Sequence, residues 1–231
     1  MTEIKLIIFD CDGVLVDSEY LAAKHELQTY SAFGFEMSVE QFAAEFAGMS
    51  SDLVFKEVEE RLGRNLPEDL LEKMQNELDD VLKSEVEMIE GADSVLDRFD
   101  LPRCICSNSG PERLKIMLQK TGLYDRFRPY IFSSRDLKPH APKPKPDIFL
   151  KAIDEFGVNP AEALVVEDSV HGVMAARLAG ARIVGFTGGR HSYPAHGDQL
   201  QDAGAETVIA GFGSLPAVVD AFSEWAGIGA A

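Results

Sequence analysis

The chain lacks long apolar runs, and none of its hydrophobic stretches approaches the ~20 residues that a membrane-spanning helix needs. Its first residues lead directly into a strand-like segment, without the basic-then-apolar pattern of a secretory signal. These absences predict no membrane partner and, as the default, a cytoplasmic location. The 231 residues, of which 45% are hydrophobic and 26% charged, suit a soluble globular protein with a core domain and a smaller insertion.

Basic residues are scarce. Lysine and arginine number 22 against 39 aspartates and glutamates, which gives a formal net charge of −17. Because proteins bind phosphate backbones through lysine and arginine, this balance argues against nucleic acid as a partner. Residues 17–90 alone hold 19 acidic and 6 basic side chains. We interpret that segment as a solvated helical surface.

Cysteine is rare as well, with three residues in the chain. The odd number and the missing secretory signal fit a reducing compartment. Cys104 and Cys106 stand two positions apart in an apolar run, so they share one face of a strand and fill space in the core. We expect neither a disulfide nor a zinc site there, because no histidine or further cysteine stands at zinc-binding spacing.

The most informative stretch of the sequence lies near its start, at residues 7–18. An apolar run leads into Asp10 and Asp12, and Gly13 follows at once. A buried strand seldom ends with two carboxylates and a flexible glycine within four residues. The pair therefore predicts a metal site, an acid–base pair, or both.

The pattern changes from strand to helix after Ser18. No convincing strand occurs before about residue 84, and apolar stripes recur at helical spacing. One stripe comprises Leu53, Val54, Val58 and Leu62, and another comprises Leu70, Leu71, Met74, Leu78, Val81 and Leu82. We therefore expect an all-α segment at residues 17–87, inserted into a core domain made of residues 1–16 and 88–231.

The core domain alternates between strand and helix patterns. The expected strands are residues 4–9, 103–107, 130–133, 163–166, 182–186 and 207–209. Strands separated by helices of this length predict an α/β fold with a doubly wound, Rossmann-like parallel sheet and right-handed crossovers.

Polar side chains follow the expected strands. In chain order they are Asp10 and Asp12, Ser107 and Asn108, Lys143, and Glu167 and Asp168. Such sheets bind ligands beyond the carboxyl ends of their strands, so we expect these residues at one edge. Four carboxylates there repel one another unless a cation neutralises them, and Mg²⁺ shared with a substrate phosphate fits that need. The lysine and the hydroxyl complete a pocket for a phosphoryl group.

These motifs resemble those of the haloacid dehalogenase superfamily, in the branch that carries a helical cap after the first motif. The matching stretches are Asp10-x-Asp12-Gly13-Val14-Leu15-Val16-Asp17-Ser18, Ser107-Asn108, Lys143-Pro144-x-Pro146-Asp147-x-Phe149, and Glu167-Asp168-Ser169. The resemblance covers essentially the whole chain. It implies a metal-dependent hydrolase whose cap, residues 17–87, closes over the core about hinges near residues 17 and 87–91.

The resemblance also implies roles for the acidic residues. Asp10 would attack phosphorus and form an aspartyl-phosphate, while Asp12 would protonate the leaving oxygen and later deprotonate water. Mg²⁺ would lie between Asp10, the backbone carbonyl of Asp12 and Asp168. Glu167 would be either a further ligand or a residue that contacts a ligand.

The remaining roles concern the phosphoryl group. Ser107, Asn108 and Lys143 would hold its oxygens, and Lys143 would also keep Asp10 ionised by direct pairing.

The resemblance leaves three functions open: a phosphatase acting on a small phosphorylated metabolite, a β-phosphoglucomutase-like mutase, and a binding or regulatory member without catalysis. The mutases carry a lysine and an arginine where this chain has Ala47 and Ser51. An acidic cap without those cations is poorly equipped for a bisphosphate, so we favour the phosphatase. Stretches such as Ile89-Glu90-Gly91-Ala92 resemble a group that acts on sugar phosphates, 6-phosphogluconate among them. We expect a monomer or a small homo-oligomer.

Two loops are harder to interpret. Residues 48–51 are either a cap loop that touches the leaving group or a plain turn between helices. Residues 188–191 either reach the pocket or form a surface loop, and we favour the surface loop. The histidines lack metal-type spacing, and we assign no chemistry to His140, His171, His191 and His196.

Overall fold

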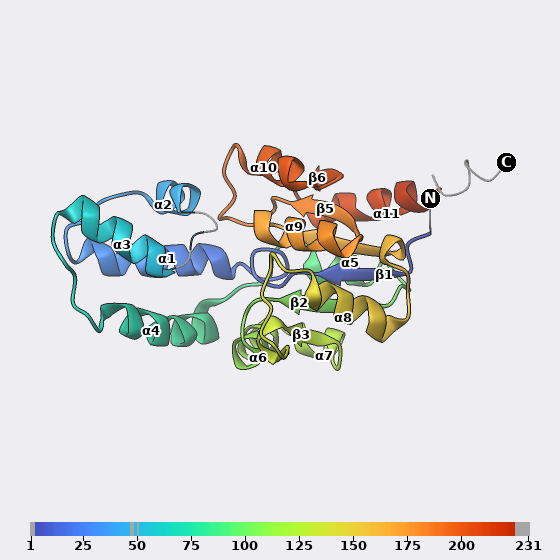
Figure 1. The fold of residues 1–231 in the computed structure, drawn as a ribbon, viewed down its shortest axis with the longest axis horizontal. Coiled ribbons are helices and arrows are strands. Elements are labelled where there is room, and N and C mark those ends of the chain that lie inside the picture. The colour runs from blue at the N-terminus through green and yellow to red at the C-terminus, as the bar shows by residue number, and fades with distance from the viewer. Residues whose placement is uncertain (1–2, 47–48, 50, 225–231) are drawn as a thin grey trace.

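Within residues 3–46, 49 and 51–224, which the computed structural model describes, six parallel strands form one sheet in the order β3-β2-β1-β4-β5-β6 (Figure 1). The strands are β1 (Leu6–Phe9), β2 (Arg103–Ser107), β3 (Ile131–Ser133), β4 (Ala163–Glu167), β5 (Arg182–Phe186) and β6 (Thr207–Ile209). In chain order, β2 and β3 extend the sheet on one side of β1, and β4, β5 and β6 then extend it on the other side. The predicted doubly wound parallel sheet is confirmed, and its strand order reverses beside β1, where such sheets bind ligands.

Helices cover both faces of the sheet because the strands are apolar on both. In β1, Leu6 and Ile8 belong to one buried cluster, whereas Ile7 and Phe9 belong to another. The first cluster is completed by α8 (Asp147–Phe156), α9 (Val170–Ala179) and α10 (His196–Ala203), and the second by α5 (Ala92–Leu96), α6 (Pro111–Lys120), α7 (Tyr124–Phe127) and α11 (Leu215–Glu224). Short 3₁₀ turns lie in the connections: η1 (Ser134–Asp136), η2 (Pro160–Glu162) and η3 (Phe212–Ser214).

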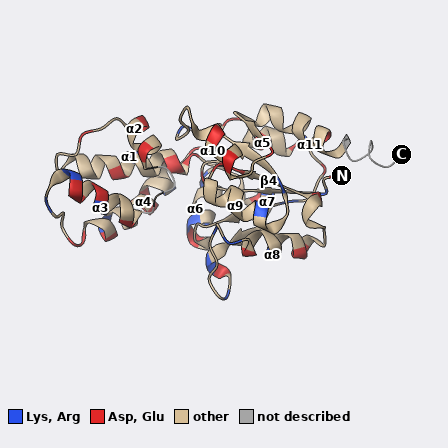
Figure 2. Ribbon diagram, turned by 45° about the horizontal axis from the view of Figure 1, so that its top comes forward, with Lys and Arg blue, Asp and Glu red and all other residues tan. Residues whose placement is uncertain are grey.

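A separate group of helices lies at one end of the molecule, away from the described end of α11 (Figure 1). It comprises α1 (Ser18–Ser31), α2 (Val39–Glu45), α3 (Ser51–Leu62) and α4 (Leu70–Glu85). These helices enclose an apolar cluster of their own around Tyr30, Phe35 and Phe42, whose rings pack within 6.2–6.4 Å of one another. Acidic positions recur along α1, α3 and α4, as Figure 2 shows. Within the described ranges, no helix has both the length and the apolar content for crossing a membrane.

The predicted apolar stripes are only partly right. In α4, Met74, Leu78 and Leu82 are buried as expected. In α3, however, Val54 and Val58 are buried while Leu53 is 53% exposed. Leu53 precedes Val54 by one position, which turns its side chain by ~100° around the helix, away from the buried face.

Two segments join α1–α4 to the sheet, and they run side by side. The backbone N–H of Asp17 donates to the carbonyl oxygen of Glu87 at 3.0 Å, and Val16 forms an antiparallel bridge with Met88. Because α1 begins immediately beyond the loop that follows β1, this helical group stands at the carboxyl end of the sheet.

Candidate active site

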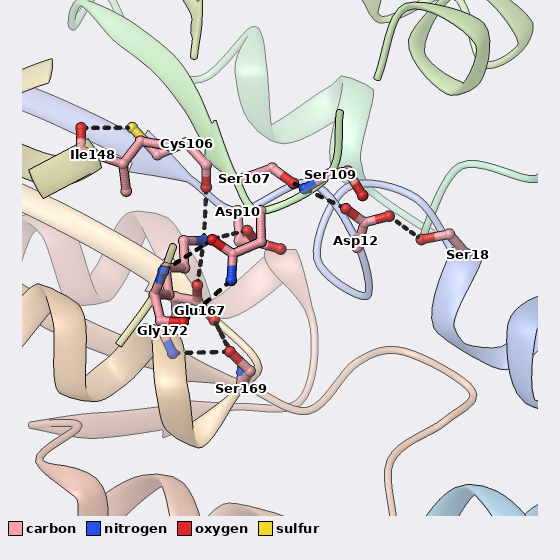
Figure 3. A network of polar contacts seen from close by, with 12 residues as sticks. Asp10, Asp12, Ser18, Cys106, Ser107, Ser109, Ile148, Glu167, Ser169 and Gly172 are labelled. Atoms are coloured by element: carbon pink, nitrogen blue, oxygen red, sulfur yellow. Dashed lines mark hydrogen bonds and ion pairs between the residues drawn. The ribbon is translucent and has the colours of Figure 1, made fainter. Parts of the chain in front are cut away.

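The ends of three adjacent strands bring the predicted polar residues together (Figure 3). Asp10 follows β1, Ser107 ends β2 and Glu167 ends β4, and β1 pairs with both of the other strands. Lys143 reaches the same place from the connection between η1 and α8. Asp10, Lys143 and Glu167 are all buried, Glu167 completely. Charged groups this deeply buried are stable only when they are paired.

Lys143 is the centre of this pairing. Its ammonium group donates to the Asp10 carboxylate, to Glu167 Oε1 at 2.6 Å and to the carbonyl oxygen of Cys106 at 2.7 Å. Burial disfavours the charged amine, but Asp10 and Glu167 outweigh it and raise the pKa of Lys143 above its ordinary value. Lys143 is therefore charged, and the predicted pairing with Asp10 is present.

The surroundings of Asp10 act on its pKa in opposite directions. Burial raises the pKa of Asp10 well above its ordinary value, and Lys143 opposes this rise only in part. Glu167, Asp168 and Asp12 raise the pKa further because each is a nearby negative charge. That Lys143 keeps Asp10 ionised stays a prediction, and a divalent cation bound in the site would favour the same carboxylate form.

The donor set fits a hard divalent cation. Among the described residues, Asp10, Glu167 and Asp168 each offer a carboxylate oxygen, and these oxygens lie within 4.8 Å of one another. Mg²⁺ is bound by such oxygen ligands and usually keeps several waters or substrate oxygens as well. Glu167 is already engaged, since its Oε2 accepts hydrogen bonds from the backbone N–H of Ser169 at 2.9 Å and from its hydroxyl at 3.0 Å.

Asp12 lies apart from that carboxylate group. Its carboxylate accepts hydrogen bonds from the Ser18 hydroxyl at 2.8 Å and from the Ser107 hydroxyl at 3.0 Å (Figure 3). The Ser107 hydroxyl also accepts from the backbone N–H of Ser109 at 2.9 Å. Two serines thus orient the Asp12 side chain, whereas the expected metal ligand from this residue is its backbone carbonyl oxygen, which stays a prediction.

Asn108 acts on the backbone of Lys143. Its Oδ1 accepts from the Lys143 N–H at 2.9 Å, and its Nδ2 donates to the Lys143 carbonyl oxygen at 3.4 Å. These contacts fix the loop that carries the lysine, and the expected contact of Asn108 with a phosphoryl oxygen stays a prediction.

Two histidines that the sequence did not single out contact Asp168. His191 Nε2 lies 2.8 Å from Asp168 Oδ2, and His196 Nε2 donates to the Asp168 carbonyl oxygen at 2.6 Å. Of the two alternatives for residues 188–191, the favoured surface loop is wrong and the loop that reaches the pocket is right, because this loop follows β5 and His191 contacts Asp168. The expected strand order could have placed the loop after β5 at this edge, whereas the spacing of the histidines in the sequence did not indicate a contact with Asp168.

A family model of haloacid dehalogenase-like hydrolases matches residues 7–186. The chain belongs to this family.

Relatives of this haloacid dehalogenase-like hydrolase extend over most of its length. A 6-phosphogluconate phosphatase of Escherichia coli is 28% identical over 195 residues, which are 84% of this chain and 87% of that protein. A conserved haloacid dehalogenase-like protein of unknown function from Agrobacterium tumefaciens has a TM-score of 0.91 and 50% identity, covering 94% of this chain and 98% of its own. A hydrolase of the same family from Deinococcus radiodurans, solved with phosphate and sodium, has a TM-score of 0.85 and 28% identity, covering 96% and 97%.

The carboxylates of this hydrolase lie directly against glycines. A Cβ on Gly172 would lie 1.8 Å from Glu167 Oε1, and a Cβ on Gly13 would lie 1.9 Å from Asp168 Oδ2. Gly13 also has a φ of +75°, which a residue with a side chain rarely adopts. Both positions therefore require glycine if the carboxylates are to keep their places.

We expect the substitution Gly172→Ala to lower the free energy of unfolding by about 1–3 kcal/mol and to weaken Mg²⁺ binding, because the methyl group displaces a buried carboxylate. Urea unfolding with and without Mg²⁺ measures both effects. Gly197→Ala is the matched control, since Gly197 also lies in the first turn of a helix and its Cβ would meet only Val208 at 3.5 Å. Equal behaviour of the two variants would contradict the packing argument.

Proposed function

We propose that this hydrolase is a Mg²⁺-dependent phosphatase that acts on a small phosphorylated metabolite, specifically a sugar phosphate. The observation that carries the proposal is that the two aspartates after β1 have different surroundings. Asp10 is buried against Lys143 and the acidic group, whereas Asp12 is held apart by Ser18 and Ser107. The 6-phosphogluconate phosphatase of Escherichia coli supports this substrate class, and the phosphate bound to the hydrolase of Deinococcus radiodurans supports a site for a phosphoryl group.

The reaction proceeds in two displacements, and Asp10 and Asp12 share the work. A carboxylate oxygen of Asp10 forms a bond to phosphorus while the bond from phosphorus to the ester oxygen breaks, and Asp12, protonated at the start of this step, gives its proton to the departing alcohol oxygen. Asp12, now a carboxylate, takes a proton from water as that water attacks phosphorus. The bond between Asp10 and phosphorus then breaks, which releases inorganic phosphate and restores the nucleophile.

Other residues of the chain support these steps. Lys143 supplies a positive charge beside the entering phosphoryl group, and Ser107 supplies a hydroxyl at the end of β2. Asp10 and Asp168 would hold Mg²⁺, with Glu167 as a further ligand or as the partner that orients Lys143. Bound Mg²⁺ neutralises part of the carboxylate charge and polarises the phosphoryl group.

Mg²⁺ is expected to stabilise the fold as well as to support activity. At a concentration of about 100 times its dissociation constant, it raises the free energy of unfolding by about 2.7 kcal/mol. Thermal unfolding in MgCl₂, compared with NaCl of equal ionic strength, measures this effect, and a chelator reverses it and stops phosphate release. Asp168→Asn is the variant that loses the response. Full activity in excess chelator would contradict the metal assignment.

We assign the helices α1–α4 the role of a cap, with residues 17–87 as the cap and residues 1–16 and 88–231 as the core. The separate aromatic cluster around Tyr30 and the paired crossings at Asp17 and Glu87 support this division. In the loop expected to touch the leaving group (residues 48–51), Gly48 and Ser50 lie outside the described residues, as does Ala47 before it. Ser51 begins α3, and its hydroxyl donates to Glu26 Oε1 of α1 at 2.8 Å.

A panel of phosphate esters tests the function. With Mg²⁺ present, we expect phosphate release from para-nitrophenyl phosphate and faster release from one or more sugar phosphates, 6-phosphogluconate among the first to try. A parallel reaction contains β-glucose 1-phosphate and the corresponding bisphosphate. If isomer forms faster than free phosphate there, the protein is a mutase. If no ester is hydrolysed, the phosphatase proposal fails.

A further inference from the structure

One arginine connects the core to both crossings of the helical segment. Arg190 lies in the connection between β5 and α10, and its side chain pairs with the carboxylate of Asp17 on the first crossing. Its Nη2 donates to Glu87 Oε2 on the second crossing at 3.2 Å, and its backbone N–H donates to Asp17 Oδ1 at 3.2 Å. The guanidinium also stacks on the ring of Tyr20, 4.6 Å from its centre, in the first turn of α1.

The pairing is anchored on a buried carboxylate. The side chain of Asp17 is only 7% exposed, whereas that of Glu87 is 71% exposed. A buried carboxylate that loses its cation is far more costly than an exposed one, so Asp17 is the strong contact and Glu87 the weak one. A planar guanidinium can satisfy two carboxylates and stack on a ring at once, which an ammonium group cannot do.

The residue that follows Arg190 contacts the catalytic edge. His191 pairs with Asp168, and Gly189 packs so closely that a Cβ there would lie 2.6 Å from the His191 ring. Adjacent residues of one tightly packed loop therefore contact a candidate metal-binding carboxylate and the two crossings. We propose that Arg190 is a positioning residue, which fixes the cap hinge to the loop behind Asp168 and so sets how the cap meets the leaving group.

This inference rests on the proposed phosphatase function and is tested first with Arg190→Gln. We expect backbone amides at residues 16–20 and 86–89 to exchange hydrogen about tenfold faster, because the crossings lose their shared partner. We also expect KM for the best sugar phosphate to rise about tenfold while kcat stays within about twofold, because Asp10 and Asp12 are untouched.

The chain offers a matched control at Arg182. This arginine also pairs with a carboxylate, Glu206 at 2.8 Å, and stacks on a ring, Phe222 at 3.9 Å, but it lies at the other end of β5. Arg182→Gln should leave hinge exchange and KM unchanged. If Arg190→Gln behaves like Arg182→Gln in both measurements, the inference is overturned.

Two further variants keep the test decisive if Arg190→Gln folds poorly. Arg190→Lys retains the charge beside Asp17, and for this reason it should restore KM to within about threefold of the original. The recovery is incomplete because an ammonium group cannot contact both crossings. Glu87→Gln should raise hinge exchange by less than Arg190→Gln and add nothing in the double variant, because both changes remove one shared contact. Fully additive effects would overturn the inference. Hinge exchange is measured without substrate, so inactivity towards every ester would refute the phosphatase function separately.

Discussion

Replacing Asp10 by asparagine is expected to lower phosphate release by about 10⁴-fold or more, because an amide oxygen cannot act as the nucleophile that accepts the phosphoryl group. The loss should appear in kcat, since the residues proposed to hold the phosphoryl group remain. Release of inorganic phosphate from the best substrate, at fixed Mg²⁺, measures it. A variant that retains more than about 1% of the activity would contradict the assignment of Asp10.

A measurement of unfolding in urea distinguishes this loss of catalysis from a loss of folded protein. Asparagine has nearly the shape of aspartate, and burial together with Glu167 and Asp168 already disfavours a charge on Asp10. Asp10→Asn should therefore unfold at a urea concentration close to that of the unchanged protein. Asp125→Asn is the control, because Asp125 is 76% exposed and pairs with Arg128 at 2.8 Å on the surface. Its activity should stay within about twofold of the original.

The sequence predicted the sheet better than the helices outside it. Residues 103–107 were expected to form a strand and do form β2, because an apolar run bounded by polar residues has few alternatives in a buried parallel sheet. The helix α2 was not delimited, yet its start carries a recognisable signal. Ser38 and Gln41 form a capping box, with reciprocal hydrogen bonds of 3.1 Å.

The sequence predicted which residues meet in the candidate site, but not which hydrogen bonds and ion pairs they form there. Strand ends placed Asp10, Ser107 and Glu167 together, since the carboxyl ends of adjacent parallel strands meet at one edge, and Lys143 was expected there from the loop that follows β3. The role of Asn108 depends on the path of a loop from a distant part of the chain, and so does the contact of His191 with Asp168. Burial also raises the pKa of Asp10, and burial of this kind is a property of the packed structure rather than of local sequence.

Replacing Lys143 by methionine is expected to have the largest effect on stability. The change removes the partner of two buried carboxylates, Asp10 and Glu167, and leaving such charges uncompensated costs about 3–5 kcal/mol. Methionine fills a similar volume, so the loss reflects charge rather than a cavity. We also expect activity to fall by about 10³-fold or more, because the phosphoryl group loses its nearest protein cation. Urea unfolding and phosphate release measure the two effects.

A second substitution tests whether charge is the cause. In Lys143→Met combined with Glu167→Gln, one uncompensated carboxylate is gone, so part of the lost stability should return although activity does not. Lys145→Met is the control for the same loop, since Lys145 is exposed and should change stability by less than about 0.5 kcal/mol. If the double variant is as unstable as the sum of its single changes predicts, the lysine stabilises the site by packing, and the electrostatic explanation fails.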